Sequence, residues 1–400
     1  MANHVRTIID GQTYYLKAES AIGIESWEHI VEINPESTQQ NWLGVSNNFV
    51  DFVIRQSDID RINEIKLKLV LKNTSGSSIS LLPSVFLIDH HQLLVAKGKV
   101  IDEQFAFSTW LDTWMLKYDE NEIDEAASMQ GYNGTTLAPT LTIAAGATST
   151  QYVDIPSLID QIRPHYGIWP PGAELTVRVW FASGTGYYVT GAAGLEITYA
   201  SLLAIGKKGP HEGSAEKDQD MNAFISNGSL DYRYLTHRSI VKKLTSKTSG
   251  QKDKIKMENV MGDVMWFTII FRNLNPTGND IINPLPFETY QIETSTSTNI
   301  LGMTDIPMDL HKKILMKNWI KDCRAIEKIN VYVHSWTPDI KLVWRTGAHV
   351  GGISEFRGEH YYAWVPRTTQ EYQVDIVAYA FQILSIRADG KVEINPLYNK

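Results

Sequence analysis

Apolar and polar residues alternate along many short stretches of this chain. In the clearest stretch, isoleucine or leucine occupies positions 65, 67, 69 and 71, while lysine occupies positions 66, 68 and 72. Residues 174–181 repeat the pattern, with Leu175, Val177 and Val179 on one face. Because successive side chains of a β-strand point to opposite faces, a period of two residues predicts a half-buried strand at both places.

Turn signals divide residues 136–200 into a strand, a short helix and two further strands. A turn at Gly146 precedes the first strand, which stops at Pro156. Ser157 then caps a short helical run that ends before Pro164, because proline disfavours helical geometry in the residue ahead of it. The two strands that follow are expected at residues 174–181 and 195–200.

The second half of the chain continues with predicted strands. Residues 265–271 are apolar at nearly every position, which indicates a strand buried on both faces. Further strands are expected at residues 329–334, 340–345, 361–365 and 371–386.

Residues 307–322 have the spacing of a helix. An apolar stripe is formed by Leu310, Ile314, Trp319 and Ile320, and lysines recur at positions 313, 317 and 321 on another face. Basic amphipathic helices lie on membranes or hold partners in some proteins. For a helix this short, packing against a barrel with the lysines in water is the favoured interpretation.

Glycine, proline and mixed charge replace the strand pattern over residues 204–220, which indicates a domain boundary. We therefore expect a first domain at residues 1–205, a linker at 206–220 and a second domain at 221–400. The halves do not align residue by residue, but each has many short strands and a short helix in its later part. This pattern predicts an all-β fold of two tandem sandwiches or jelly-roll barrels.

Composition narrows the possible functions. The net charge of −8 over 400 residues argues against specific nucleic-acid binding, since phosphate neutralisation needs a basic surface. A single cysteine, Cys323, excludes an internal disulfide and is compatible with assembly in a reducing cytoplasm. A membrane-spanning helix needs about 18 consecutive apolar residues, and no apolar run in this sequence approaches that length. The first residues lack the apolar core of a signal peptide. The basic stretch that begins at Lys242 and ends at Lys256 is expected to be an exposed loop.

Candidate chemistry is sparse. His90 and His91, next to Asp89, are the only adjacent histidine pair, but neighbours in a strand point to opposite faces and no third ligand has a helpful spacing. Cys323 lacks a local signature for a nucleophile. Three further histidines are scattered through the second half without a nucleophile motif: His334, His349 and His360. We expect no catalytic, cofactor-binding or metal-binding residue and no cofactor.

Two other features have both a functional and a structural interpretation. The acidic run over residues 119–125 lacks the Asp-x-Asp-x-Asp-Gly spacing that wraps calcium, so a solvated loop is expected. Tryptophans can stack on sugars, although in a β-rich protein they more often belong to a core or an interface. The candidates are Trp110, Trp114, Trp169, Trp336 and Trp344.

Two stretches resemble a known family. Residues 137–148, Leu-Ala-Pro-Thr-Leu-Thr-Ile-Ala-Ala-Gly-Ala-Thr, with the strands after them, resemble the first barrel of the double jelly-roll major capsid proteins of tailless, membrane-containing phages, the tectivirus type. Residues 361–381 resemble the closing hairpin of that family. The resemblance lies in the order of the predicted strands and in the local sequence of these two stretches. It includes no motif that indicates a chemical activity. The long amphipathic N-terminal helix of that family has no counterpart in residues 1–60.

The resemblance implies a bacteriophage structural protein, not an enzyme, with two jelly-roll barrels and a short helix in each. Three copies would form a pseudo-hexameric homotrimer, because six similar barrels then fill a six-fold position of an icosahedral virion shell. The implied partners are other copies of the chain, neighbouring capsomers, minor capsid or vertex proteins and an internal viral membrane. Assembly would take place in the host cytoplasm.

A second interpretation is a two-module β-sandwich that binds or cleaves carbohydrate. The two carboxylates of a glycoside hydrolase can come from anywhere in a chain. Oligomeric state and site anatomy distinguish the two: a coat protein forms stable trimers and lacks a deep cleft lined by paired carboxylates. The length, the absence of chemical motifs and the resemblance favour the coat protein.

Overall fold

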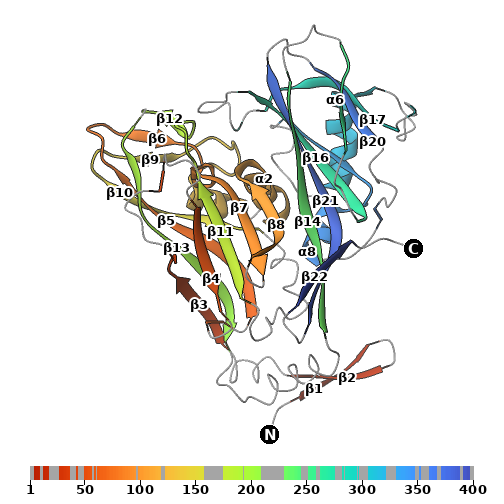
Figure 1. The fold of residues 1–400 in the computed structure, drawn as a ribbon, viewed down its shortest axis with the longest axis horizontal. Helices are drawn as coiled ribbons and strands as arrows, with labels where there is room; N and C mark the ends of the chain where they lie inside the picture. Colours follow the sequence, from red (N-terminus) through yellow and green to blue (C-terminus); the bar gives the residue numbers. More distant parts are fainter. Residues whose placement is uncertain are drawn as a thin grey trace.

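Two β-rich bodies lie side by side in Figure 1, one built from residues 27–208 and the other from residues 229 onward. The computed structural model describes residues 4–9, 12–17, 27–36, 42–43, 49–55, 58–59, 61–95, 98–118, 122–156, 174–191, 193–208, 229–244, 251–257, 262–274, 282, 284–294, 296, 305–320, 330–346, 351–352, 360–366, 371–387 and 391–396.

The first body is a barrel of eight antiparallel strands in two sheets. The strands are β3 (Trp27–Ile33), β4 (Phe49–Ile54), β5 (Arg61–Asn73), β7 (Ile88–Val95), β8 (Lys99–Phe105), β10 (Thr148–Asp154), β11 (Leu175–Phe181) and β13 (Leu195–Lys208). One sheet has the order β10-β5-β13-β3 and the other the order β4-β11-β7-β8. A small extra sheet joins β12 (Tyr188–Thr190), β6 (Ile79–Leu81) and β9 (Leu141–Ile143).

The alternation predicted from the sequence places the core of this barrel. On β5, Leu67, Leu69 and Leu71 are fully buried, and the lysines between them lie on the opposite face. Leu175, Val177 and Val179 on β11 are fully buried as well. Both half-buried strands are therefore confirmed, and their apolar faces meet inside the barrel.

In the described part of the second body, eight strands again form the two main sheets. They are β14 (Ser229–Leu244), β15 (Asp253–Lys256), β16 (Val264–Asn273), β17 (Phe287–Thr294), β18 (Ile306–Pro307), β19 (Val331–Ser335), β20 (His360–Pro366) and β21 (Tyr372–Arg387). The sheet orders are β14-β21-β16-β19 and β15-β20-β17-β18, and β22 (Val392–Pro396) pairs with β21. The hairpin of β1 (His4–Ile9) and β2 (Gln12–Lys17) stands apart from both barrels (Figure 1).

The two barrels share one topology. When the strands of each are numbered from one to eight in chain order, both barrels have one sheet of order 1-8-3-6 and one of order 2-7-4-5. Two such sheets packed face to face form a jelly roll, and the chain is a double jelly roll. The duplication that the sequence shows only as a repeated pattern is thus visible strand by strand.

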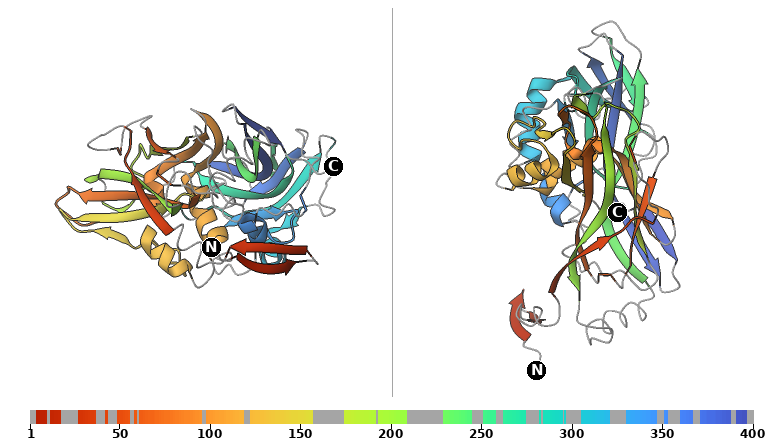
Figure 2. Two further views of the ribbon diagram at one scale, coloured as in Figure 1. Left: turned by 90° about the horizontal axis from the view of Figure 1, so that it is seen from below. Right: turned by 90° about the vertical axis from the view of Figure 1, so that its left-hand side faces the viewer.

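Helices occupy the same place in both barrels, between strands five and six. In the first barrel they are α2 (Ala106–Asp112), the π-helical η2 (Thr113–Lys117) and α3 (Ile123–Gln130), and in the second α6 (Met308–Leu310), the π-helical η5 (His311–Met316) and α7 (Lys317–Trp319). π-Helical turns are rare, so their presence at matching positions supports the structural repeat. Figure 2 shows both helical segments on the same side of the molecule.

The predicted helix at residues 307–322 is confirmed over residues 308–319, but its buried face agrees only in part with the predicted one. Ile320 of the predicted stripe is buried, but so are Met308 and Met316, which were not part of it, and Ile314 is 51% exposed beside two exposed lysines. His311, which was not part of the predicted stripe, also lies on the buried face. The π-helical turn rotates the stripe relative to the 3.6-residue period on which the prediction was based.

Three local predictions were wrong. Residues 340–345 were expected to form a strand but form α8 (Ile340–Thr346), in which Ile340, Val343 and Trp344 are buried at helical spacing and Leu342 is 51% exposed. The acidic run was expected to be a loop, yet its end forms the first turn of α3. The expected basic loop instead includes the end of β14 and all of β15.

The expected linker at 206–220 begins inside β13, which continues to Lys208, and its remainder lies outside the described residues, as does the expected helix at 157–163. The domain boundaries remain a proposal. Strands expected at 265–271, 361–365 and 371–386 are confirmed as parts of β16, β20 and β21. Within the described part of the chain, no helix is long and apolar enough to cross a membrane.

Candidate functional site: the junction between the two barrels

The two barrels meet where β8 and its following helix face β14. Side chains of β14 bond to the edge of β8: the Tyr234 hydroxyl and the Thr236 hydroxyl both donate to the carbonyl oxygen of Ile101, at 3.3 and 3.5 Å. At the first residue of β8, Lys99 Nζ donates to the carbonyl oxygen of Val392 at 2.7 Å. These side-chain bonds cover a strand edge that would otherwise offer unpaired backbone groups to another chain.

A buried histidine is held between two carboxylates at the centre of this junction. His237 Nδ1 lies 2.9 Å from Asp102 Oδ2, and His237 Nε2 lies 3.0 Å from Asp112 Oδ2. The backbone amide of His237 also donates to Asp102 Oδ1 at 3.0 Å. All three side chains are essentially inaccessible to solvent. A carboxylate oxygen faces each ring nitrogen, which favours the imidazolium, the form in which both nitrogens donate.

The acid-base state follows from competing effects. Burial by itself would lower the pKa of His237, but the charge of Asp102 and hydrogen bonds to both carboxylates outweigh it and raise that pKa to about 10. Burial would raise the pKa of Asp102, yet the imidazolium more than offsets it and keeps that pKa below its usual value. The junction therefore holds a fixed positive charge from the second barrel against carboxylates from the first.

Aromatic rings surround this charged group. The Tyr379 hydroxyl donates to Asp112 Oδ1 at 2.6 Å, and its ring meets the His237 ring edge-on with centroids 4.8 Å apart. Tyr379 also stacks on Trp266 at 4.5 Å, and Trp344 lies 5.9 Å from His237. Water is therefore kept away from the ion pairs, which strengthens them and makes the loss of either partner costly.

The apolar contacts across the junction are continuous with the core of the first barrel. One cluster of buried residues runs from that core to Trp266, Tyr379 and Phe381, on the outer face of the sheet β14-β21-β16-β19. The inner face of the same sheet belongs to a separate cluster that contains Phe267, Ile269 and Ile376. Residues 265–271 are buried on both faces for this reason, as predicted.

The structure separates the histidine pair at positions 90 and 91. Both residues lie on β7, where His90 stacks on Trp180 at 4.1 Å on the outer face and His91 is buried inside. Burial lowers the pKa of His91 to about 4, so the ring is neutral. The described residues contain no group of three or more His, Cys, Asp or Glu side chains that could hold a metal.

The remaining candidates fall into two groups. His334 is buried in the second barrel, where its Nδ1 lies 3.3 Å from the Tyr290 hydroxyl. Trp110, Trp114 and Trp344 are buried and Trp336 is half-buried, so the first three are not available to stack on a sugar. The candidates outside the described residues or side chains are Trp169, Cys323, His349 and His360.

Four residues of the junction were not predicted from the sequence: Asp102, Asp112, His237 and Tyr379. Asp112 carried a usable signal, because a single carboxylate stands between two tryptophans in a run of otherwise apolar or small residues. Its partner could not be found from the sequence, since Asp112 and His237 are 125 positions apart in chain number and come from different barrels. Asp102 and Asp112 are a pair of carboxylates, but they do not line an open cleft of the kind expected for a glycoside hydrolase.

Comparison with solved structures identifies the same fold in viral proteins. The VP54 protein of PBCV-1, fitted into a reconstruction of the virophage Sputnik, matches with a TM-score of 0.69 at 12% identity over 92% of this chain and 97% of that chain. The Faustovirus major capsid protein matches with a TM-score of 0.62 at 10% identity, covering 90% of each chain. The mavirus major capsid protein gives 0.53 at 11% identity over 93% and 90%. No protein-family model matches the sequence, and a search of curated proteins finds no match.

Proposed function

We propose that this chain is the major coat protein of an icosahedral virus and acts by assembly, not catalysis. The observation that carries the proposal is the repeated barrel: two jelly rolls of one strand order are joined through a buried charged junction into a single unit. Solved structures of the same fold include proteins described as major capsid proteins of Faustovirus and mavirus.

A chain with two similar barrels is a suitable building block for an icosahedral shell. Three copies of a two-barrel chain supply six similar barrels, which fill a six-fold position with only three subunits. The junction fixes the angle between the two barrels of each copy. Its ion pairs are directional hydrogen bonds, and apolar side chains shield them from water. We infer that the chain forms homotrimers of this kind and that these trimers meet neighbouring capsomers in the virion.

The same proposal names the other partners. Minor capsid or vertex proteins would occupy positions between trimers, and an internal viral membrane would lie beneath the shell. The acidic net charge of −8 supports a role without specific nucleic-acid binding. Assembly in the host cytoplasm, with a bacterial host, is part of the proposal.

Native mass spectrometry of the purified full chain tests the proposal. The expected mass is that of three chains of 45.2 kDa each, with no smaller species in excess at micromolar concentration. A monomer would contradict the proposal. Hydrolysis of an oligosaccharide by a monomeric chain would instead support the carbohydrate-active alternative.

A further inference from the structure

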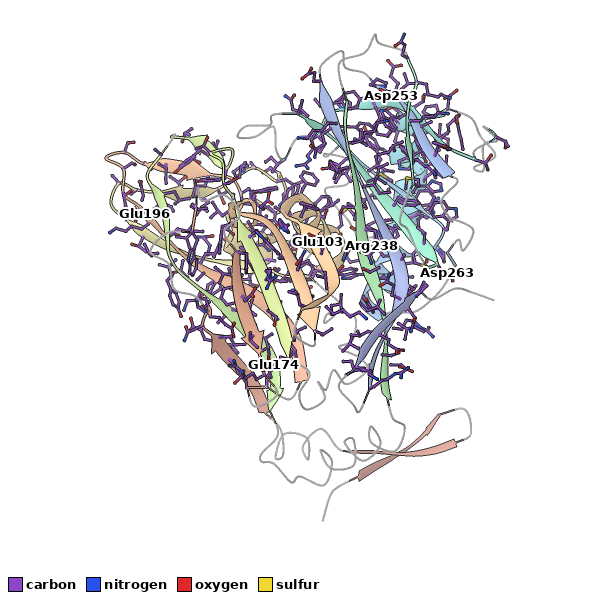
Figure 3. All side chains as sticks on the ribbon, in the orientation of Figure 1. Glu103, Glu174, Glu196, Arg238, Asp253 and Asp263 are labelled. Carbon is purple, nitrogen blue, oxygen red and sulfur yellow. The ribbon has the colours of Figure 1, made fainter. Side chains whose placement is uncertain are left out.

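An exposed face of the first barrel corresponds to a face that is buried in the second. The sheet of order 1-8-3-6 is β14-β21-β16-β19 in the second barrel, and the first barrel covers its outer face. In the first barrel the same sheet is β10-β5-β13-β3, which lies on the side away from the second barrel (Figure 1). Glu196 on β13 marks this side in Figure 3, far from Glu103 and Arg238 at the junction.

The uncovered face carries exposed apolar side chains, whereas the solvent-facing side of a sheet is usually polar. Ile30 on β3 is 63% exposed and Tyr199 on β13 is 37% exposed, with Leu203 and Ile205 half-buried beside them. Glu32 lies among them and accepts hydrogen bonds from Ser201 Oγ at 2.6 Å and Lys68 Nζ at 2.9 Å. These bonds keep the pKa of Glu32 below its usual value, so the carboxylate is charged at neutral pH.

The covering element has a counterpart as well. In the junction, the helix after strand five of the first barrel reaches the second barrel through Asp112. The helical segment after strand five of the second barrel, made of α6 and η5, contains Ile314. Ile314 is 51% exposed, and the exposed residues Lys313 and Lys317 lie on either side of it.

We propose that the face made by Ile30, Glu32, Tyr199 and Leu203 is covered in the assembled protein by the helical segment around Ile314 of a second copy. This inference rests on the proposed function and names the contact that closes its ring. Within one copy, strand five and its helix cover strand one of the next barrel, so the same arrangement between copies continues the ring. Apolar Ile314 then meets Ile30 of the neighbouring copy.

Cysteine cross-linking tests the contact directly. In a Cys323→Ser background, the pair Ile30→Cys and Ile314→Cys should form a covalent trimer under oxidation. β3 and α6 lie on opposite sides of one chain, so the link must join different copies (Figure 1). The matched control pairs Ile30→Cys with Leu342→Cys, because Leu342 is also 51% exposed on a helix of the second barrel. The proposal expects no covalent trimer from the control.

A second measurement uses Ile314→Asp and Leu342→Asp. Both positions are half-exposed, so both variants should fold, as checked by their melting temperatures. Ile314→Asp should raise the trimer dissociation constant by about tenfold or more, whereas Leu342→Asp should leave it unchanged. A trimer that is unaffected by Ile314→Asp and gives no cross-link overturns this contact but leaves the proposed function in place. A wild-type chain that remains monomeric overturns both.

Discussion

Asp102 and His237 form a hydrogen-bonded ion pair of 2.9 Å that joins strand five of the first barrel to strand one of the second. Both side chains are buried, and Asp112 binds the other ring nitrogen of the same histidine at 3.0 Å. The pairing makes the relative position of the barrels depend on charge as well as on apolar packing.

Replacement of His237 by alanine should destabilise the chain by about 3–5 kcal/mol, because two carboxylates would remain buried without their cation. Urea unfolding, followed by tryptophan fluorescence, measures the change. His90→Ala is the matched control: its ring stacks on the outer face of β7, and its loss should cost about 1 kcal/mol. Equal effects of the two substitutions would show that the junction ion pairs contribute little.

Stability should fall as the pH rises from about 6.5 to about 10. The folded His237 keeps its proton up to a pKa of about 10, whereas the unfolded residue loses it near the ordinary value of 6.5. Folding therefore takes up a proton within this window, and the stabilisation is complete only below it. Denaturation midpoints measured across this range should show the slope in wild type, and His237→Ala should remove most of it. A flat wild-type profile would contradict the assignment of an imidazolium.

On the acid side, stability should fall as the pH drops from about 6.5 towards 4. Burial lowers the pKa of His91 and of His334 to about 4 and that of His311 to about 3, so these rings stay neutral in the folded chain. The unfolded chain binds protons at these positions below pH 6.5, which favours unfolding. His91→Gln should reduce the pH dependence measured by urea titration. Protein that is equally stable at pH 6.5 and 4 would argue against neutral buried histidines.

Asp154 should anchor the helices of the first barrel to β5 and β10. Its carboxylate accepts bonds from Lys66 at 3.1 Å, Lys117 at 3.0 Å, Tyr118 at 2.9 Å and Gln130 at 2.9 Å. Asp154→Ala leaves Lys66 and Lys117 with Glu64 as their remaining carboxylate and should cost about 1–3 kcal/mol through the lost hydrogen bonds. Hydrogen exchange should accelerate over residues 106–130 in particular. Asp89→Ala, at a side chain that is 62% exposed, is the control and should stay within about 0.5 kcal/mol.

The sequence predicted strands well wherever one face of a sheet meets solvent. On β5 and β11 the alternation of side chains is a direct consequence of the sheet geometry, so the buried residues were identified correctly. The same rule failed at residues 340–345, because alternate apolar residues also fit a short helix when Val343 completes the buried set. Short apolar runs remain ambiguous between the two periods.

The junction could not be predicted in the same way. His237 lies in a strand and Asp112 in a helix, and neither belongs to a motif with fixed spacing. Their contact depends on how two barrels are placed, which is decided by packing of residues far apart in the sequence. The family resemblance predicted the two barrels, but it did not predict the charged group that joins them.

Projection images of the assembled particle test the central claim most directly. If each copy is a rigid pair of equivalent jelly rolls, each capsomer should contain three chains and show six barrels of similar size around its axis. Capsomers with three or five lobes, or a protein that forms no regular array, would contradict the account.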